Sequence, residues 1–324
     1  FGASEGRVTD VTLASVTVTG DKNVGGLVGT NDKGTITDVT ISGNVAGDED
    51  VGGLVGSSDG TDSNPANITN ATASVSVAGT RVSSSNLGGL VGLNVGSIEN
   101  ATAFGSVNGT ENVGGLVGQN LGGVTTARAS GNVIGGASLG GLVGFNGEFG
   151  GPERNVIIRE ATASGSVISV TGTTSEGGVG GLVGSNTETI RNASARGNVN
   201  KNNNKSFVNA GGLAGQNNDN GIIQETFAVG SVTGEGDVGG LVGQNQSDAT
   251  VEQSYFDTTV SGTNQSESAG NATGLTTAEM QGQAATSNMS GFEFGVDWQT
   301  QTDPADYPVL ISLQQGTEPE QQQP

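Results

Sequence analysis

The 324-residue sequence contains no cysteine and no histidine. These absences exclude disulfides, thiolate nucleophiles, Cys/His zinc sites and every Ser-His or Cys-His catalytic arrangement. Basic residues are scarce, with 11 Lys and Arg against 32 Asp and Glu, which gives a formal net charge of −21. This charge repels phosphate backbones and anionic membranes, so we expect no nucleic-acid binding. No apolar run approaches the roughly 18 residues of a membrane span, so we expect no direct membrane insertion of this segment.

Lysine is particularly rare, with four residues in the chain. An acidic surface that is poor in lysine keeps a protein hydrated in concentrated salt, where charge repulsion is screened. The composition therefore suggests a halophilic source. An acidic secreted protein from another environment is the alternative.

Glycine is in excess, at 59 of 324 residues, and much of it belongs to one phrase. The phrase reads GGLVG seven times and GGLAG once, and an apolar residue always precedes it. The intervals of 26 to 40 residues indicate a basal unit of about 26 residues with insertions. Periods of this size are typical of stacked repeats rather than of independent domains. The eight copies begin at Gly25, Gly52, Gly88, Gly114, Gly140, Gly180, Gly211 and Gly239.

A strand pattern follows each phrase, most clearly as Ile98, Ala101, Ala103, Gly105 and Val107. From its second member onward the spacing is two, which places these residues on one face of a strand. A unit this small cannot close a core alone, so copies must stack, with equivalent strands pairing about 4.8 Å apart. The predicted fold class is therefore all-β, a parallel β-helix (β-solenoid) of about nine rungs. We expect a right-handed coil.

Two residue types have predicted structural roles in each rung. The Gly-Gly pair is expected to supply a corner with unrestricted φ, and inward Gly or Ala lets the coil walls approach closely. An amide follows the phrase in seven of its eight copies. We predict that these amides stack as a corner ladder, each hydrogen-bonded to the next, with a ligand-binding role as the alternative. The ladder residues are Asn31, Asn94, Asn120, Asn146, Asn186, Asn217 and Asn245.

The phrase (V/L)GGLVGxN, followed by an Ile/Val-x-x-A-x-A-x-G-x-V strand, resembles the GLUG-motif repeats of adhesin-like secreted and cell-surface proteins of bacteria and archaea. The resemblance covers roughly residues 1–250. It implies β-helical architecture and an extracellular or cell-surface location. It implies no catalytic activity, because such repeats serve as stalks beside many different functional modules.

The chain divides into three predicted parts. Residues 1–250 form the solenoid repeats, and alignment of Phe1 to Ser4 with Val28 to Asn31 indicates a truncated first rung. Residues 251–313 form a C-terminal cap, and residues 314–324 form a polar, flexible tail or linker. Thr276 and Glu279 read as a capping box that opens a short helix through about Ala285. The cap holds six of the twelve aromatic residues, which we expect to close the open end of the solenoid: Tyr255, Phe256, Phe292, Phe294, Trp298 and Tyr307.

Two kinds of candidate site remain. Asp48, Asp50, Asp59 and Asp62 concentrate oxygen ligands in turns, where calcium could bind, but they match no EF-hand spacing, and solvated acidic loops are the alternative. Asn-x-Ser/Thr sequons are candidates for glycosylation in a secreted protein. Besides Asn245 of the ladder, they lie at Asn67, Asn70, Asn100, Asn108, Asn192, Asn204, Asn264, Asn271 and Asn288.

One outward strand position carries mostly hydroxyl groups, which could order water or stack along a glycan. Threonine is favoured on any exposed strand, so the column can equally be structural. Its members are Thr40, Thr72, Thr102, Arg128, Thr162, Ser194 and Phe227. Polysaccharide-cleaving β-helices need paired carboxylates, whereas these strand faces carry Thr, Ser, Asn and Ala. We therefore expect no enzyme, no catalytic residues and no cofactor.

The main functional hypothesis is a non-catalytic extracellular module that spaces or presents adhesive surfaces. Its expected partners are other copies of the chain, other surface proteins and glycans. One alternative is a carbohydrate-binding or carbohydrate-processing β-helix. Another is the polymerising subunit of an extracellular filament, built by head-to-tail contact.

Overall fold

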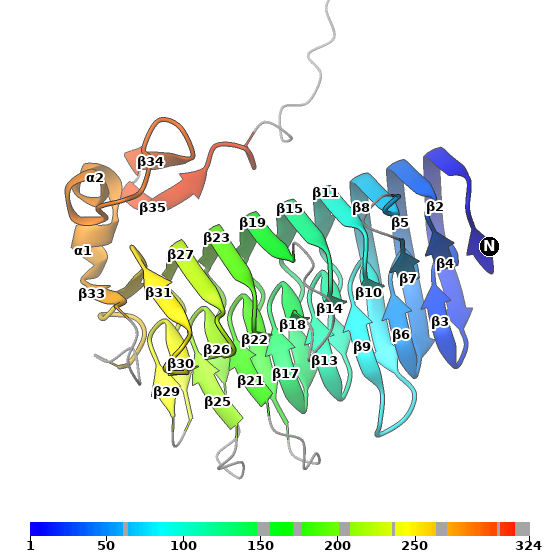
Figure 1. Cartoon of the computed structure of the whole chain (residues 1–324), viewed down its shortest axis with the longest axis horizontal. Helices are drawn as coiled ribbons and strands as arrows, with labels where there is room; N and C mark the ends of the chain where they lie inside the picture. The colour runs from blue at the N-terminus through cyan, green and yellow to red at the C-terminus, as the bar shows by residue number, and fades with distance from the viewer. Residues whose placement is uncertain are drawn as a thin grey trace, which may run out of the picture.

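Each repeat forms one turn of a parallel β-solenoid, as the sequence predicted (Figure 1). The computed structural model describes residues 1–314 except 61–63, 148–155, 171–176, 201–207, 235–236, 264–270 and 303–304. About eight turns stack along the long axis of the molecule. Equivalent repeat positions face one another, so that Val91 pairs with Val117 and Asn94 with Asn120.

Three parallel sheets form the walls of the solenoid. Sheet A has nine strands, which start directly after the Gly-Gly-Leu of the phrase from the second strand onward. They are β1 (Ala3–Ser4), β4 (Val28–Asp32), β7 (Val55–Asp59), β10 (Val91–Asn94), β14 (Val117–Asn120), β18 (Val143–Asn146), β22 (Val183–Asn186), β26 (Ala214–Asn217) and β30 (Val242–Asn245).

Sheet C has eight strands, and each ends at the first glycine of the phrase. The corner between sheets C and A is therefore the Gly-Leu step of each copy. The strands are β3 (Lys22–Gly25), β6 (Glu49–Gly52), β9 (Ser85–Gly88), β13 (Glu111–Gly114), β17 (Ala137–Gly140), β21 (Gly177–Gly180), β25 (Val208–Gly211) and β29 (Val238–Gly239).

Sheet B has sixteen strands and contains the Ile-x-x-Ala-x-Ala pattern. Its long strands are β2 (Arg7–Thr19), β5 (Thr35–Gly47), β8 (Asn67–Gly79), β11 (Ser97–Ala103), β15 (Gly123–Ala129), β19 (Ile157–Ala163), β23 (Thr189–Ala195) and β27 (Ile222–Ala228). Short strands continue it as β12 (Val107–Asn108), β16 (Val133–Gly135), β20 (Val167–Ser169), β24 (Val199–Asn200), β28 (Val232–Thr233), β31 (Thr250–Glu252), β32 (Tyr255–Asp257) and β33 (Thr273–Leu275).

One continuous apolar core runs inside the three sheets, from Val24 to Phe256. It is built from columns of identical or similar side chains, because equivalent positions stack. The leucine of every phrase is buried, from Leu27 to Leu241. Burial of each such side chain stabilises the fold by about 1.5–3 kcal/mol.

The Gly-Gly pairs have a different physical role from the predicted one. None of their sixteen glycines has a positive φ; among the described residues, positive-φ glycines occur at seven other positions, such as Gly43. The expectation of unrestricted φ at this corner is therefore wrong. What these positions require is space. A Cβ on Gly52 would lie 1.9 Å from the Val55 carbonyl oxygen, and one on Gly53 would lie 2.1 Å from the carbonyl oxygen of Gly89.

Left-handed corners are made instead by polar residues, and Asn and Asp, whose short side chains tolerate this conformation, make up most of them. One such residue interrupts each long strand of sheet B and explains the three-residue step from Ile98 to Ala101. We call this column the polar row. Gln253, between β31 and β32, continues the column beyond the long strands. The row consists of Asp10, Asp38, Asn70, Asn100, Thr126, Glu160, Asn192, Glu225 and Gln253, with φ between 46° and 58°. A second column precedes the phrase, with φ between 49° and 56° at Asn23, Asp50, Asn86, Asn112 and Ser138.

The C-terminal region begins at the end of the core and then turns back. Phe256 belongs to the solenoid core and lies against Gly240, so it closes the end as predicted. The capping box of Thr276 and Glu279 is present. The expected single helix is two short ones with a 3-10 turn between them. These are α1 (Thr277–Met280), the turn Gly282–Ala284 and α2 (Ala285–Asn288), and the antiparallel strands β34 (Trp298–Thr302) and β35 (Ala305–Leu310) follow.

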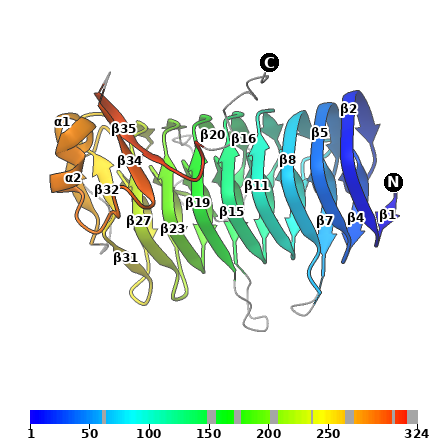
Figure 2. The ribbon, with the colours of Figure 1, turned by 90° about the horizontal axis from the view of Figure 1, so that it is seen from above.

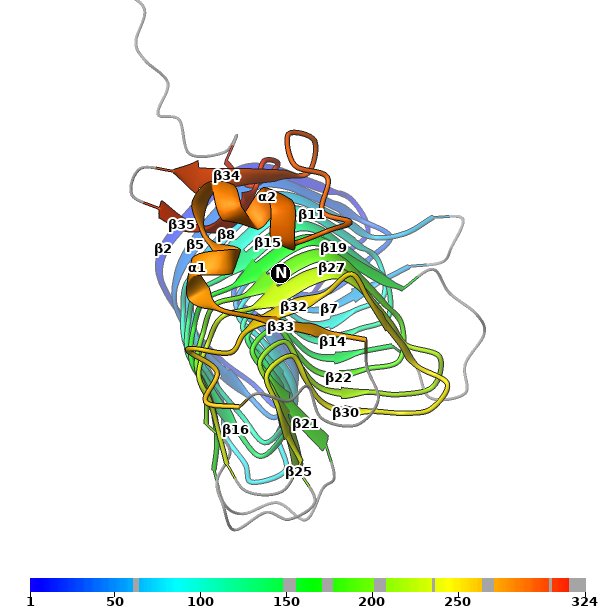
Figure 3. The ribbon, with the colours of Figure 1, turned by 90° about the vertical axis from the view of Figure 1, so that its left-hand side faces the viewer.

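The other aromatic side chains of the cap do not close the end of the solenoid. Tyr255, Phe292 and Trp298 pack with Phe227 in a separate apolar cluster. Phe227 projects outward from β27, so this cluster lies on the outer face of sheet B. Figure 2 shows β34 and β35 laid across that face, and Figure 3 shows them beside the solenoid rather than over its axis. We call the segment from Trp298 to Leu313 the C-terminal arm.

Raising the pH is expected to detach the C-terminal arm. The Tyr307 hydroxyl donates to the buried Asp257 carboxylate at 2.6 Å, and burial and this bond raise the pKa of Tyr307 to about 12. The folded chain therefore keeps a proton that the unfolded chain releases near pH 10, so this stabilisation is lost as pH rises from about 10 to 12. Trp298, the one tryptophan, is fully buried in the cluster, and its fluorescence should shift to the red in this window. An identical pH profile for Tyr307→Phe would contradict the assignment.

Candidate functional site

The predicted corner asparagines form a hydrogen-bonded ladder at the end of the sheet A strands. Each side-chain Nδ2 donates to the Oδ1 of the next rung at 2.7–2.8 Å, from Asn94 through Asn120, Asn146, Asn186 and Asn217 to Asn245. The same Nδ2 also donates to a backbone carbonyl within its own rung, for example from Asn120 to Gly122 at 3.0 Å. The amides are thus bonded to protein on both sides, which favours the structural role over the ligand role.

The amide ladder is interrupted in one rung. Ser58 occupies the ladder position between Asn31 and Asn94. Its hydroxyl is too short to bridge two rungs, so the Asn94 Oδ1 and the Ser58 Oγ are buried without partners within the described residues. The Asn31 Oδ1 also lacks a partner there, because Ser4 occupies the ladder position of the preceding rung. Asn31 instead donates to the carbonyl of Gly34 at 3.1 Å.

The outward hydroxyl column of sheet B contains two irregular members, and both contact the C-terminal arm. The Phe227 ring lies 5.4 Å from that of Trp298 between centroids. The Arg128 guanidinium donates to the carbonyl of Leu313. Near the same face, Arg196 donates to the Pro308 carbonyl at 2.6 Å. The guanidinium carbon of Arg196, Cζ, lies 5.6 Å from the Phe227 ring centroid. These departures from the repeat are therefore the docking points of the arm.

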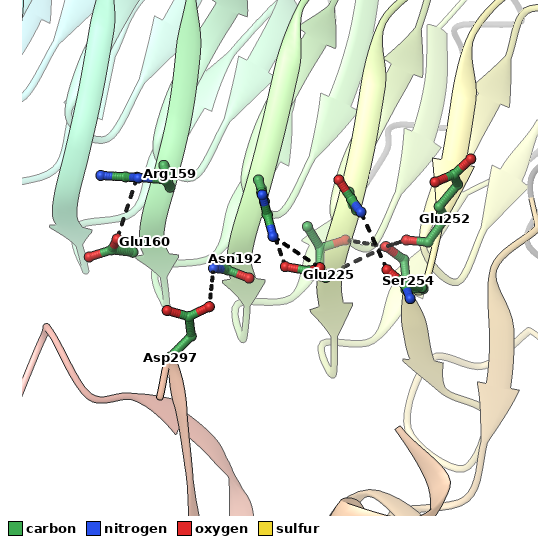
Figure 4. A network of polar contacts seen from close by, with 11 residues as sticks. Arg159, Glu160, Asn192, Glu225, Glu252, Ser254 and Asp297 are labelled. Atoms are coloured by element: carbon green, nitrogen blue, oxygen red, sulfur yellow. Dashed lines mark hydrogen bonds and ion pairs between the residues drawn. The ribbon is translucent and has the colours of Figure 1, made fainter. Parts of the chain in front are cut away.

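The polar row continues under the arm (Figure 4). Asn192 donates to the Asp297 carboxylate at 2.9 Å, and Arg191 binds Glu225 through two nitrogens at 3.0 and 3.2 Å. Arg159 and Glu160 form a further pair at 3.4 Å. These acids are therefore engaged in protein contacts, although Glu160 and Asp297 also line a hollow of about 210 Å³ beside the arm.

Beyond the end of the arm, the outer face of sheet B is hollowed into a groove of about 420 Å³. Asn70, Thr72, Asn100, Thr102, Phe104, Thr126 and Arg128 line it from the solenoid, and Ser312 and Leu313 line it from the arm. A smaller hollow continues beneath the arm past Thr162, Ser194 and Arg196. The groove thus combines hydroxyls, amides, one cation and an aromatic ring that is 54% exposed, Phe104.

Two of the four candidate calcium ligands, Asp48 and Asp50, have protein partners. Asp48 forms an ion pair with Arg81 at 2.9 Å, and Asp50 accepts a hydrogen bond from Asn86 at 2.9 Å. Burial raises the pKa of Asp50, and the bond from Asn86 opposes this rise. Asp59 lies on β7, and Asp62 falls outside the described residues. No group of three metal-ligating side chains occurs in the part of the chain that the structure describes.

The sequons differ in accessibility. Asn70, Asn100, Asn108, Asn271 and Asn288 are exposed, and Asn67 is half-buried. Asn192 is buried and bonded to Asp297, so a glycan there would have to displace this contact. Asn204 and Asn264 lie outside the described residues.

Sequence reasoning missed both the polar row and the groove. A signal for the polar row exists, because an Asn, Asp or Glu often stands directly before the first strand alanine. The groove has no such signal, because its second wall comes from residues 312–313, nearly 200 positions away from Arg128.

Four stretches of the chain match the family model of the GLUG motif: residues 20–46, 47–78, 83–108 and 175–200. Each contains one Gly-Gly-Leu-Val phrase, so the predicted resemblance is confirmed at four repeat positions. No curated protein and no solved structure matches the chain. No helix among the described residues is long and apolar enough to cross a membrane.

Proposed function

The chain is a β-solenoid that contains GLUG repeats, and from this we propose that it is a non-catalytic structural module of an extracellular or cell-surface protein. It acts as a stiff stalk that spaces or presents adhesive surfaces. The observation that carries the proposal is the continuous stack of rungs, because one core and the hydrogen bonds of three sheets connect all eight turns.

The chemistry of the surface supports a non-catalytic role. General acid–base cleavage of a glycan needs two carboxyl groups that face each other across a cleft. The groove beyond the end of the arm is lined by no carboxylate. A smaller hollow beside the arm is lined by Glu160 and Asp297, but Glu160 is paired with Arg159 and Asp297 accepts from Asn192.

The net charge of the chain supports a salt-rich extracellular environment. A net charge of −21 destabilises a compact chain at low ionic strength, and salt screens this repulsion. The stacked amides and the apolar core do not depend on ionic strength, so the rod keeps its shape in concentrated salt.

The stiffness of the stalk can be measured between two introduced spin labels, because the chain has no cysteine of its own. Thr19 and Thr233 are exposed and occupy the same column, seven rungs apart. Labels on Thr19→Cys and Thr233→Cys should give one narrow distance of about 34 Å, because each rung adds about 4.8 Å. The distance should not change between dilute buffer and about 2 M NaCl.

Replacing Thr233→Cys by Asn200→Cys provides the matched control, since Asn200 lies one rung closer in the same column. The distance should shorten by about 5 Å. A broad or salt-dependent distribution would contradict the stalk, and turnover of any polysaccharide would contradict the non-catalytic assignment.

A further inference from the structure

The groove between sheet B and the C-terminal arm has the chemistry of a binding site that the stalk function does not require. We propose that it binds a neutral glycan, with pyranose rings lying across the rungs beside Phe104. This assignment adds a lateral binding site to the stalk and does not depend on the stalk function.

Phe104 supplies the apolar contact. It follows β11, and the residue is 54% exposed although it lines the groove. Its exposed ring offers an apolar surface in the groove that Leu313 also lines, and Thr72 and Thr102 contribute hydroxyl groups to the same lining. A pyranose ring also combines an apolar face with hydroxyl groups at its edge. Its face can therefore pack on the aromatic ring, and its hydroxyl groups can bond to the polar side chains of the groove.

The polar row supplies donors and acceptors at the groove. Asn100 donates to Asn70 at 2.7 Å, and Asn70 donates to Asp38 at 2.8 Å. Within the described residues no side-chain bond links Asn100 to Thr126 of the next rung, because Thr126 instead pairs with Glu160. The row is therefore open at the groove, and the Asn100 amide oxygen can accept from a sugar hydroxyl.

The arm forms the opposite wall of the groove through Ser312 and Leu313. The Ser312 hydroxyl oxygen is shielded from solvent, so the arm contributes the shape of this wall rather than a hydrogen bond to the ligand.

Electrostatics favours an uncharged ligand. The chain carries a net charge of −21, which repels anionic polymers as they approach. The one cation of the groove, Arg128, already donates to the Leu313 carbonyl, and burial lowers its pKa. Asp38 lies at the other end of the bonded amides. The groove therefore offers a sugar acid little compensation for its charge.

The backbone of the groove disfavours an extended peptide as the ligand. Peptides that bind β-sheets generally add a strand at a free edge, where backbone N–H and C=O groups are unpaired. Here the floor consists of β8, β11 and β15, which are central strands that pair on both sides. Only their side chains face the groove, so recognition must be through side-chain contacts.

Binding can be tested with protein from a host that does not N-glycosylate, because Asn70 and Asn100 are sequons. An array of neutral gluco-, galacto-, manno- and N-acetylglucosamine oligomers, with uronate oligomers beside them, should give binding to a subset of the neutral sugars. Calorimetry with the strongest array hit should then show about tenfold weaker binding for Phe104→Ala and about fivefold weaker binding for Asn100→Gly. Glycine keeps the left-handed backbone of Asn100, so the second variant removes only the amide.

Two control variants make comparable changes elsewhere. Val82→Ala truncates another exposed apolar residue, and Asn112→Gly removes an amide from a residue with the same left-handed φ at a different corner. Both should bind as the unaltered chain does. The proposal is overturned if no neutral glycan binds, if only uronates bind, or if the controls lose affinity as much as the groove variants. These outcomes leave the distance measurements on the stalk unaffected, so the two proposals can fail separately.

Discussion

Gly114→Ala is expected to destabilise the solenoid by about 3 kcal/mol or more, or to prevent folding. Gly114 ends β13 at the corner between sheets C and A. A Cβ at this position would lie 1.9 Å from the carbonyl oxygen of Val117 and 2.8 Å from the backbone nitrogen of Gly144 in the next rung. Both atoms belong to the backbone and take part in the stack, so neither can move without disrupting two rungs. Chemical denaturation, followed by circular dichroism, measures the loss.

Gly123→Ala is the matched control, because Gly123 stands on β15 of the same rung. A Cβ there would have one neighbour within 4 Å, the Ser97 side chain at 3.9 Å. Alanine should be neutral or slightly stabilising, since it restricts the unfolded chain. Equal effects of the two substitutions would refute the view that the phrase glycines are kept for clearance.

The contrast between these glycines explains how much of the fold could be predicted. Repetition of Gly-Gly-Leu-Val fixed the period, the parallel stacking and the register, because identical residues at a fixed spacing can satisfy one another only by stacking. The same repetition did not distinguish two reasons for a glycine. Clearance and a left-handed φ both favour Gly, and the structure assigns clearance to the phrase and the left-handed corners to residues such as Asn70 and Asn86.

The C-terminal arm could not be predicted because it depends on contacts between distant residues. Arg128 and Phe227 interrupt a hydroxyl column, and in the sequence they are only irregularities of the repeat. Their partners, Leu313 and Trp298, lie 185 and 71 positions further along the chain. A repeat determines contacts between neighbouring rungs, whereas a segment that folds back over several rungs follows no period. The groove could not be predicted for the same reason, because the arm forms one of its two walls.

Asn120→Leu is expected to reduce the free energy of unfolding by about 2–5 kcal/mol, although leucine has a similar shape. Asn120 accepts from Asn94 at 2.8 Å and donates to Asn146 at 2.8 Å, and all three side chains are fully buried. Leucine would leave an amide donor and an amide oxygen without these partners in the interior, at a cost of about 1–3 kcal/mol each. Gln119→Leu on the same strand is the control, since Gln119 is only half-buried, and it should change stability by about 0.5 kcal/mol or less.

The reverse substitution tests how much the hydrogen bonds between ladder amides stabilise the fold, in a rung where the ladder is already interrupted. Ser58→Asn places an amide between Asn31 and Asn94, and the buried Asn94 Oδ1 lacks a partner within the described residues. The new Nδ2 would donate to the Asn94 Oδ1, and the new Oδ1 would accept from Asn31, as in the five intact links. A gain of about 1 kcal/mol is expected in the same denaturation experiment. If Asn120→Leu destabilises the chain and Ser58→Asn also destabilises it, the amides act through packing alone. Opposite signs for the two substitutions would show that hydrogen bonding between rungs stabilises the rod.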